Sequence, residues 1–217
     1  AKEQRDAGTP PSSPGLALDF LVEAVQGCDV VVNAAGVSAA RSHRLGNLIA
    51  ANALLPLLVL RSCQENGVKR FVHVSTAAVQ GDIEILDSST SYRPLSPYAR
   101  SKVLGELWLL QEAQNRPWVV LYRPQGVHAP HRPLTRSIRR LGVMGLLPVA
   151  GVGSGPAPQA LVGNVADAIA FVATSEADPP RVVHHPWEGL TCEEFACAVG
   201  GRKPWRMDER LATFISG

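Results

Sequence analysis

The feature that most limits the possible folds of this chain is a set of three mainly apolar runs, separated by stretches of helical length. The runs occupy residues 30–36, 70–75 and 118–122. None of them shows a strict alternation of apolar and polar residues, which is typical of strands buried on both faces of a parallel sheet. The stretches between them, residues 45–66 and 97–112, are predicted to be helices, and this strand–helix alternation predicts a doubly wound α/β fold.

Proline and capping residues place the remaining elements. Pro56 falls inside the predicted helix at residues 45–66, so a kink is expected there. Residues 1–18 contain closely spaced prolines and are expected to form a mobile leader. Further along, the sequence predicts three more elements: a helix at residues 165–174, a strand at residues 181–184, and a helix opening at Thr191 with Glu194 as its capping-box partner.

Composition excludes several classes of protein. Hydrophobic residues make up 46% of the chain and charged residues 18%, so general disorder is not expected. The formal charge of +2 gives no support to a nucleic-acid partner. The longest apolar stretch, residues 54–60, is short and interrupted by proline, so no membrane span is expected. The four cysteines form no Cys-x-x-Cys pair, which favours reduced, mostly buried thiols in a cytoplasmic protein.

The chemistry-bearing feature is the pair Tyr98 and Lys102. On a helix, residues four apart share a face, so the phenol and the ammonium project together. A neighbouring cation favours the phenolate and lowers the high pKa of tyrosine, which would make Tyr98 a usable general acid or base. The same spacing is also common on solvated helices, so the pair alone is weak evidence.

A second feature strengthens this interpretation. Ser75 and Thr76 stand where the second predicted strand ends. Ligands of open α/β sheets bind outside the carboxyl ends of the strands, so the Thr76 hydroxyl is expected in the same crevice as Tyr98. The alternative role for such hydroxyls is capping of the turn after the strand.

These residues resemble, in order, the motifs of the extended short-chain dehydrogenases/reductases, also called NAD-dependent epimerases/dehydratases. Residues 29–36 are similar to the family's fourth strand and its small-residue turn. The other matching segments are Asn52 of the next helix, residues 67–76 and 79–81 around the catalytic hydroxyl, residues 96–102 with Glu106 in the Tyr-x-x-x-Lys helix, and the Arg-Pro segment at residues 123–130.

The resemblance implies a Rossmann-type fold, a cofactor and a reaction. Tyr98 would exchange the proton of a secondary alcohol or ketone, Lys102 would assist it and hold the nicotinamide ribose, and Thr76 would orient the reacting oxygen. NAD or NADP would be the cofactor, and a nucleotide sugar or a sterol-like alcohol the substrate. Extended members often form homodimers through the helices that carry Tyr98 and Asn52. The resemblance implies cofactor contacts at Ala34, Ala35, Gly36, Asn52, Ser75, Lys102, Pro124 and Val127.

The resemblance also implies a division of the chain. A partial dinucleotide-binding domain is expected at residues 19–130 and a mainly substrate-binding lobe at residues 131–217. Residues 161–175 are expected to return to the first domain. The family's opening strand and glycine-rich turn have no counterpart before Val30, which suggests either a fragment or a degenerate member. A non-catalytic remnant that acts as a binding or regulatory protein is therefore the rival hypothesis.

Other departures and motifs favour ordinary roles. Leu55-Pro56 replaces a Gly-Thr pair common after the family's Asn, and Ala77-Ala78 replaces the acidic pair of sugar dehydratases. Residues 151–155 are glycine-rich, but the prolines that follow favour a loop over a phosphate site. His184 and His185 are adjacent and should point to opposite faces, so a metal site is not expected. His73 is interpreted as a satisfied core residue, and four arginines (Arg132, Arg136, Arg139 and Arg140) as either phosphate contacts or a solvated helix face.

Overall fold

The computed structural model describes residues 15–38, 44–81, 83, 85–113 and 117–208. Their contacts define two compact units, which are described separately. The first unit contains the described residues up to Gln125 together with Ala166–His185. The second contains Gly126–Val165 and the described residues from Pro186 onward. The chain therefore leaves the first unit directly after the Arg-Pro segment and returns to it through one helix and one strand.

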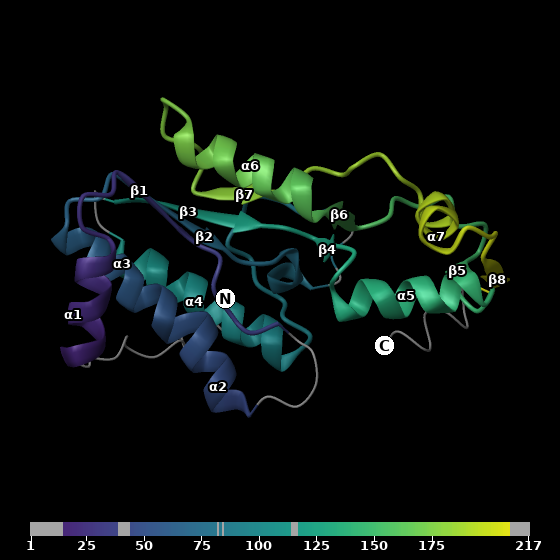
Figure 1. Cartoon of the computed structure of the whole chain (residues 1–217), viewed down its shortest axis with the longest axis horizontal. Helices are drawn as coiled ribbons and strands as arrows, with labels where there is room; N and C mark the ends of the chain where they lie inside the picture. Colours follow the sequence, from purple (N-terminus) through teal and green to yellow (C-terminus); the bar gives the residue numbers. More distant parts are fainter. Residues whose placement is uncertain (1–14, 39–43, 82, 84, 114–116, 209–217) are drawn as a thin grey trace. The chain divides into compact units, whose positions relative to one another are not determined.

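The first unit is built on a four-stranded parallel sheet (Figure 1). Its strands lie in the order β1 (Val30–Asn33), β2 (Arg70–Val74), β3 (Trp118–Arg123) and β7 (Val182–His184). All three strand pairings are parallel. The predicted strands are confirmed. The apolar run at residues 30–36 is a strand only as far as Asn33, and its small residues form the turn that follows.

Helices cover both faces of this sheet, which confirms the predicted doubly wound Rossmann-type arrangement. Figure 1 shows α3 (Leu55–Glu65) and α4 (Pro97–Glu112) on one face and α6 (Val162–Thr174) on the other. The helix α1 (Gly15–Ala24) packs against α3 and includes the last residues of the predicted leader. The rest of the predicted leader lies outside the described residues.

Pro56 shapes the helix between β1 and β2 differently from the kink expected. The helix runs through α2 (Leu45–Ile49) and α3 without a break, joined by the π-helical segment η1 (Ala50–Leu54). The Leu55 N–H bonds to the Ala50 carbonyl, one residue further back than in an α-helix. Proline has no N–H, and its ring clashes with the carbonyl four residues back, which here is Asn52. The wider π turn relieves that clash at the residue singled out by the family resemblance.

The core lies between the sheet and α3–α4. It is formed by apolar residues of both helices and of the strands, together with one residue of the turn before β2: Val59, Leu60, Cys63, Val68, Phe71, Leu109, Val119, Leu121 and Val182. The stretch Leu45–Glu65 is long and apolar enough to cross a membrane by length and composition, which the sequence did not lead us to expect. Half of that stretch is buried within the protein, as is typical of a core helix.

All four cysteines are free, and only Cys63 is buried. The expectation of mostly buried thiols is therefore wrong. Cys28 follows the turn after α1 and is exposed, while the other two lie half-buried in the second unit. Burial raises the pKa of the Cys63 thiol to about 12, so Cys63 behaves as a small apolar core residue.

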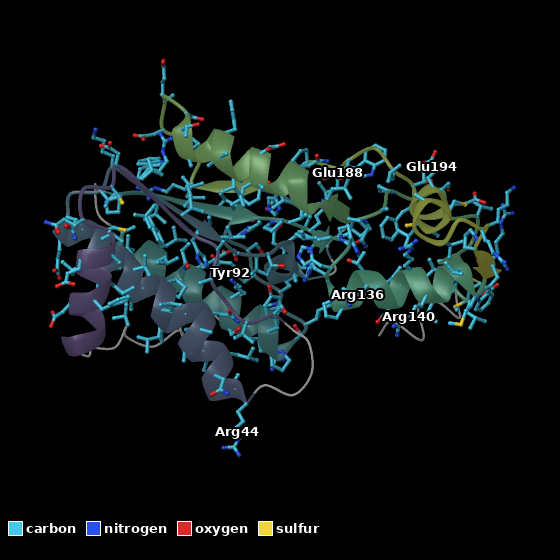
Figure 2. All side chains as sticks on the ribbon, in the orientation of Figure 1. Arg44, Tyr92, Arg136, Arg140, Glu188 and Glu194 are labelled. Carbon is cyan, nitrogen blue, oxygen red and sulfur yellow. The ribbon has the colours of Figure 1, made fainter. Side chains whose placement is uncertain are left out.

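The second unit is smaller and made of short elements. Its strands form two parallel pairs, β4 (Gly126–His128) with β6 (Gln159–Leu161) and β5 (Pro148–Ala150) with β8 (Trp205–Met207). The helices α5 (Pro133–Val143) and α7 (Cys192–Gly200) approach closely where Gly142 meets Gly200. The predicted capping box of Thr191 and Glu194 opens α7, and Figure 2 labels Glu194 there. The glycine-rich residues 151–155 form a turn and loop, as predicted.

Candidate active site

The carboxyl ends of neighbouring strands collect most of the residues expected at a cofactor site. Ala34, Ala35 and Gly36 follow β1 and are exposed. Ser75 and Thr76 follow β2, and Pro124 follows β3. The Ala77 N–H donates to the Pro124 carbonyl at 2.9 Å, which holds the segments after β2 and β3 together. Open α/β sheets bind ligands at this edge.

The start of α4 places the catalytic candidates of this helix. Ser96 caps the helix, because its hydroxyl accepts a hydrogen bond from the Ala99 N–H at 3.1 Å, and Pro97 occupies the first turn. Tyr98 is half-buried in the same turn. Lys102 follows one turn later on the same face. The positive end of the helix dipole favours negative charge in the turn that carries Tyr98.

Lys102 is a buried ammonium. The residue is 4% exposed, and Nζ donates to the Val74 carbonyl at 3.0 Å, at the very end of β2. Burial lowers the pKa of Lys102 to about 8, and the nearby Glu106 carboxylate opposes that shift. The lysine is therefore charged at neutral pH but close to losing its proton, a property common in functional sites.

Thr76 caps a turn, which is one of the two roles considered from the sequence. Its hydroxyl accepts a hydrogen bond from the Ala78 N–H at 3.3 Å and so caps the 3₁₀ turn η2 (Ala77–Gln80). A threonine hydroxyl that accepts one bond still has a hydrogen to donate. Thr76 can therefore cap the turn and also bind the oxygen of a substrate.

Asn52 organises the turn after β1. Its Oδ1 accepts from the Val37 N–H at 2.9 Å, and its Nδ2 donates to the Val37 carbonyl and to Ser101 Oγ, each at 3.0 Å. All three bonds of the Asn52 amide go to other residues of the protein, so the geometry supports a role for Asn52 in positioning the turn after β1. A Cβ on Gly36 would lie 2.8 Å from Asn52 Oδ1 and 3.3 Å from Lys102 Nζ, so a side chain at this position would displace the Asn52 amide.

The site therefore joins Gly36, Asn52, Ser75 and Lys102 with the two segments that contain Thr76 and Pro124. Ser75 is buried, and its Oγ has no hydrogen-bond partner among the described residues. Val127, also predicted to contact the cofactor, lies in β4 of the second unit.

Sequence reasoning gave no role to a buried ion pair that ties α4 to β3. Arg123 and Glu106 are both fully buried and joined twice, by Nε to Oε1 at 3.0 Å and by Nη2 to Oε2 at 2.6 Å. The remaining guanidinium nitrogen of Arg123, Nη1, donates to the Ser89 carbonyl. The guanidinium also lies over the ring of Tyr92, which is labelled in Figure 2. A signal was present, because Glu106 is four residues beyond Lys102 on the same helix face.

Hydrogen bonds within the first unit also account for the two adjacent histidines, His184 and His185. Gln80 holds the loop through Asp87, and His184 Nε2 lies 2.9 Å from the Asp87 carbonyl. His185 Nδ1 instead shares a 2.5 Å hydrogen bond with the Tyr122 hydroxyl. Among the described residues, no group of three or more His, Cys, Asp or Glu is placed to hold a metal ion.

The arginines of α5 are mostly solvated. Arg136, Arg139 and Arg140 are exposed, and Figure 2 labels the first and the last of them. Arg132 is half-buried and donates to the Val127 carbonyl. Arg132 thus makes a structural contact to β4, while the three exposed arginines present positive charge to solvent.

Comparisons with known proteins agree with this geometry. Residues 15–184 match the model of the family described as "NAD dependent epimerase/dehydratase family". A curated relative, the uncharacterized UDP-glucose epimerase YtcB of Bacillus subtilis (strain 168), is 31% identical over 90 residues, which are 40% of this chain and 28% of that protein. The chain thus spans well under two thirds of this relative.

Solved structures share the fold at low sequence identity. MoeE5 in complex with UDP-glucose and NAD is 21% identical with a TM-score of 0.68, over 88% of this chain and 69% of that one. UDP-glucuronic acid 4-epimerase from Bacillus cereus, in complex with UDP-glucuronic acid and NAD, is 17% identical with a TM-score of 0.69, over 87% and 64%. Because the family match covers most of the chain, this protein belongs to the NAD-dependent epimerase/dehydratase family.

Proposed function

We propose that this chain carries the active part of an NAD-dependent oxidoreductase or epimerase that acts on a secondary hydroxyl group of a nucleotide sugar. The observation that carries the proposal is the buried Lys102 ammonium, fixed at the end of β2 one helical turn from Tyr98 and beside the segment of Thr76. The relatives' names support the nucleotide-sugar class over the sterol-like alternative.

The residues at the strand ends fit a nicotinamide cofactor. The exposed turn Ala34–Gly36 offers backbone that a ligand can approach, and Gly36 leaves no Cβ in the way. The orphaned hydroxyl of Ser75 offers a polar contact, and Lys102 has donors beyond the one used at Val74. We expect these residues, with Pro124, to hold NAD. When bound, NAD supplies the hydride acceptor and donor.

The chain's own residues would transfer the proton of the substrate hydroxyl. Thr76 donates a hydrogen bond to the reacting oxygen and fixes its distance from the Tyr98 phenol. Tyr98 takes the hydroxyl proton when the alcohol is oxidised and returns it when the ketone is reduced. The Lys102 ammonium and the positive end of α4 both favour the phenolate form of Tyr98, so its oxygen can carry the negative charge before it takes the proton and again after it returns the proton.

Binding of the cofactor is the first test. NADH fluorescence titrations of the 217-residue chain should show saturable binding, and NADPH provides the comparison that separates NAD from NADP preference. Tyr98→Phe serves as the matched variant, since it removes one hydroxyl and should leave cofactor binding intact. Turnover of UDP-glucose or UDP-glucuronic acid that disappears in Tyr98→Phe supports the proposal. Binding only by a longer version encoded upstream would make this chain part of an active oxidoreductase, whereas absence of binding by both would favour a non-catalytic remnant.

A further inference from the structure

His73 is the next-to-last residue of β2, and it is 0% exposed. It was expected to be a satisfied core residue, but only one of its two ring nitrogens is satisfied. Nδ1 lies 3.1 Å from Asn33 Nδ2 on the neighbouring strand. Nε2 has no hydrogen-bond partner within the described parts of the chain. Buried polar groups are nearly always paired, so this nitrogen requires an explanation.

The hydrogen bonds of Asn33 fix the proton on the His73 ring. Asn33 Oδ1 accepts from the Ala35 N–H at 3.2 Å, so the amide is oriented with its NH₂ group toward the imidazole. His73 Nδ1 must then accept, and the ring proton resides on Nε2. Burial, and secondarily the charge of Lys102, lower the pKa of His73 well below its usual value. The ring is therefore a neutral donor whose N–H points into the interior.

Two other polar groups surround this donor. Ser75 lies two residues further along the chain from His73, which places both side chains on the same side of the strand, and its Oγ is also buried without a partner in the described structure. Lys102 Nζ is held at the carbonyl of Val74, the residue between them, and has further hydrogens to donate. Two donors and one hydroxyl thus converge around the end of β2.

The spacing suits one water molecule. His73 Nε2 and Ser75 Oγ both lack a partner in the part of the chain that the structure describes, so they do not bond to each other directly, although their side chains leave the strand only about 6.6 Å apart. One water can join two such atoms across about 4.6 Å, because its two hydrogen bonds of about 2.8 Å meet at a roughly tetrahedral angle. Internal waters need two to four polar partners, and three are present here.

We propose that His73 is a positioning residue for Lys102 and acts through one buried water. The water accepts hydrogen bonds from His73 Nε2–H and from the Lys102 ammonium, and donates to Ser75 Oγ. It holds the ammonium at the end of β2, so that Lys102 remains directed toward the turn at Gly36. This role deepens the proposed function and rests on it, because Lys102 needs such positioning only if it assists Tyr98.

Nuclear magnetic resonance tests the water directly and needs no activity. In the ¹⁵N-labelled chain, His73 should show the Nε2–H tautomer, with Asn33→Asp expected to move the proton to Nδ1. The His73 Hε2 signal should give a cross-peak to a long-lived water. A wild-type ring protonated on Nδ1, or an Hε2 proton without a water cross-peak, would overturn the proposal.

Three variants test the positioning role. His73→Phe removes the donor, His73→Gln keeps an N–H donor, and Phe71→Leu is the matched control on the same face of β2. His73→Phe should shift the ¹⁵N resonance of Lys102 Nζ and lower kcat about tenfold with KM unchanged, and His73→Gln should restore most of both. An unchanged Lys102 resonance in His73→Phe, or an equal change in Phe71→Leu, would refute positioning.

These readouts keep the two proposals distinguishable. The His73 tautomer, the water cross-peak and the Lys102 resonance report on the chain alone. If these signals appear as expected while neither the wild-type chain nor a longer version encoded upstream binds NADH or turns over a nucleotide sugar, the proposed function fails and the water site stands. If the chain is active but kcat is the same in His73→Phe as in Phe71→Leu, the positioning role fails and the proposed function stands.

Discussion

At the scale of single residues, Lys102 illustrates a conflict between folding and chemistry. Its pKa of about 8 in the folded chain lies below the usual value near 10.4 for an unfolded chain. Between these two pH values the unfolded chain binds a proton that the folded chain does not, so the contribution of Lys102 to stability increases as the pH rises from about 8 to about 10.4. The charged lysine therefore opposes folding at neutral pH.

We expect Lys102→Met to remove this pH dependence. The wild-type chain should gain on the order of 3 kcal/mol from this group across that window, and the variant should not. Urea denaturation of both proteins at about pH 7.5 and about pH 10 measures the difference, and comparison of the two cancels other titrating groups such as Cys63. Parallel curves for the two proteins would contradict the buried, perturbed lysine. The variant should also lose turnover.

Thr76 provides a test of whether capping and catalysis can be separated. Thr76→Ser keeps the hydroxyl and should retain activity within a few-fold. Thr76→Val removes both functions, so kcat should fall by about 10²-fold, the lower range for loss of one hydrogen-bond donor to a reacting oxygen. The accompanying loss of the η2 cap should cost about 1 kcal/mol, measured by thermal unfolding. Full activity in Thr76→Val would exclude it from the reaction.

At the scale of elements, α4, the helix that carries Tyr98 and Lys102, is anchored by its buried ion pair. Glu106→Gln leaves the Arg123 guanidinium buried without its charged partner, which typically costs about 3–5 kcal/mol. We expect the denaturation midpoint to drop accordingly. Glu112→Gln is a matched control, because Glu112 pairs with Arg61 near the surface, and such pairs contribute about 0–1 kcal/mol. Equal effects of the two changes would contradict the importance of burial.

The contact between α4 and the π segment is equally specific. A Cβ on Gly105 would lie 2.2 Å from the Asn52 carbonyl oxygen, a clash with rigid backbone. Gly105→Ala should therefore push α4 away from η1 and destabilise the protein by about 1–3 kcal/mol, despite the better helix propensity of alanine. Gly46→Ala is the control, because a Cβ at Gly46 would meet no atom within 4 Å. A neutral or stabilising Gly105→Ala would show that the helices can separate freely.

The sequence predicted the elements that contain long apolar patterns and missed those that depend on contacts. The strands at Val30, Arg70 and Trp118 were found because buried parallel strands leave continuous apolar runs. The four strands of the second unit have three residues each, too few to show a period. The π turn could not be predicted, because Pro56 specifies only that an α-helical bond is lost and not how the chain compensates.

The site was predictable to a similar extent. Thr76, Tyr98 and Lys102 were predicted as catalytic residues from their type, their spacing and the family resemblance, and the structure places Lys102 against the end of β2, where Thr76 follows. The commitment of the Asn52 amide to Val37 and Ser101 was not predictable, since nothing in the sequence brings those residues together. The unpaired ring nitrogen of His73 is likewise visible only once burial and neighbours are known.

At the scale of the whole molecule, we propose that the chain forms a homodimer through α4 and the helical stretch that carries Asn52. Val103 of α4 is buried within the chain itself. Leu54, Leu104 and Leu107 are half-buried on the same two helices and are better candidates for the interface. Light scattering should give about twice the chain mass of 23.1 kDa, and Leu107→Glu should give a monomer. A wild-type monomer would refute the proposal.

Arg70 has a consequence for how the chain is made. Its buried guanidinium donates to the carbonyls of Val172, Ala173, Ser175 and Ala177 at the end of α6, and to Asp178, 108 residues further along the chain. A ribosome that adds about 5–20 residues per second needs roughly 5–20 s to reach those acceptors. During that interval a nascent chain holds β2 with an unpaired charge. Folding of the first unit should therefore wait for α6 to emerge, and a chain stopped before it should depend on chaperones.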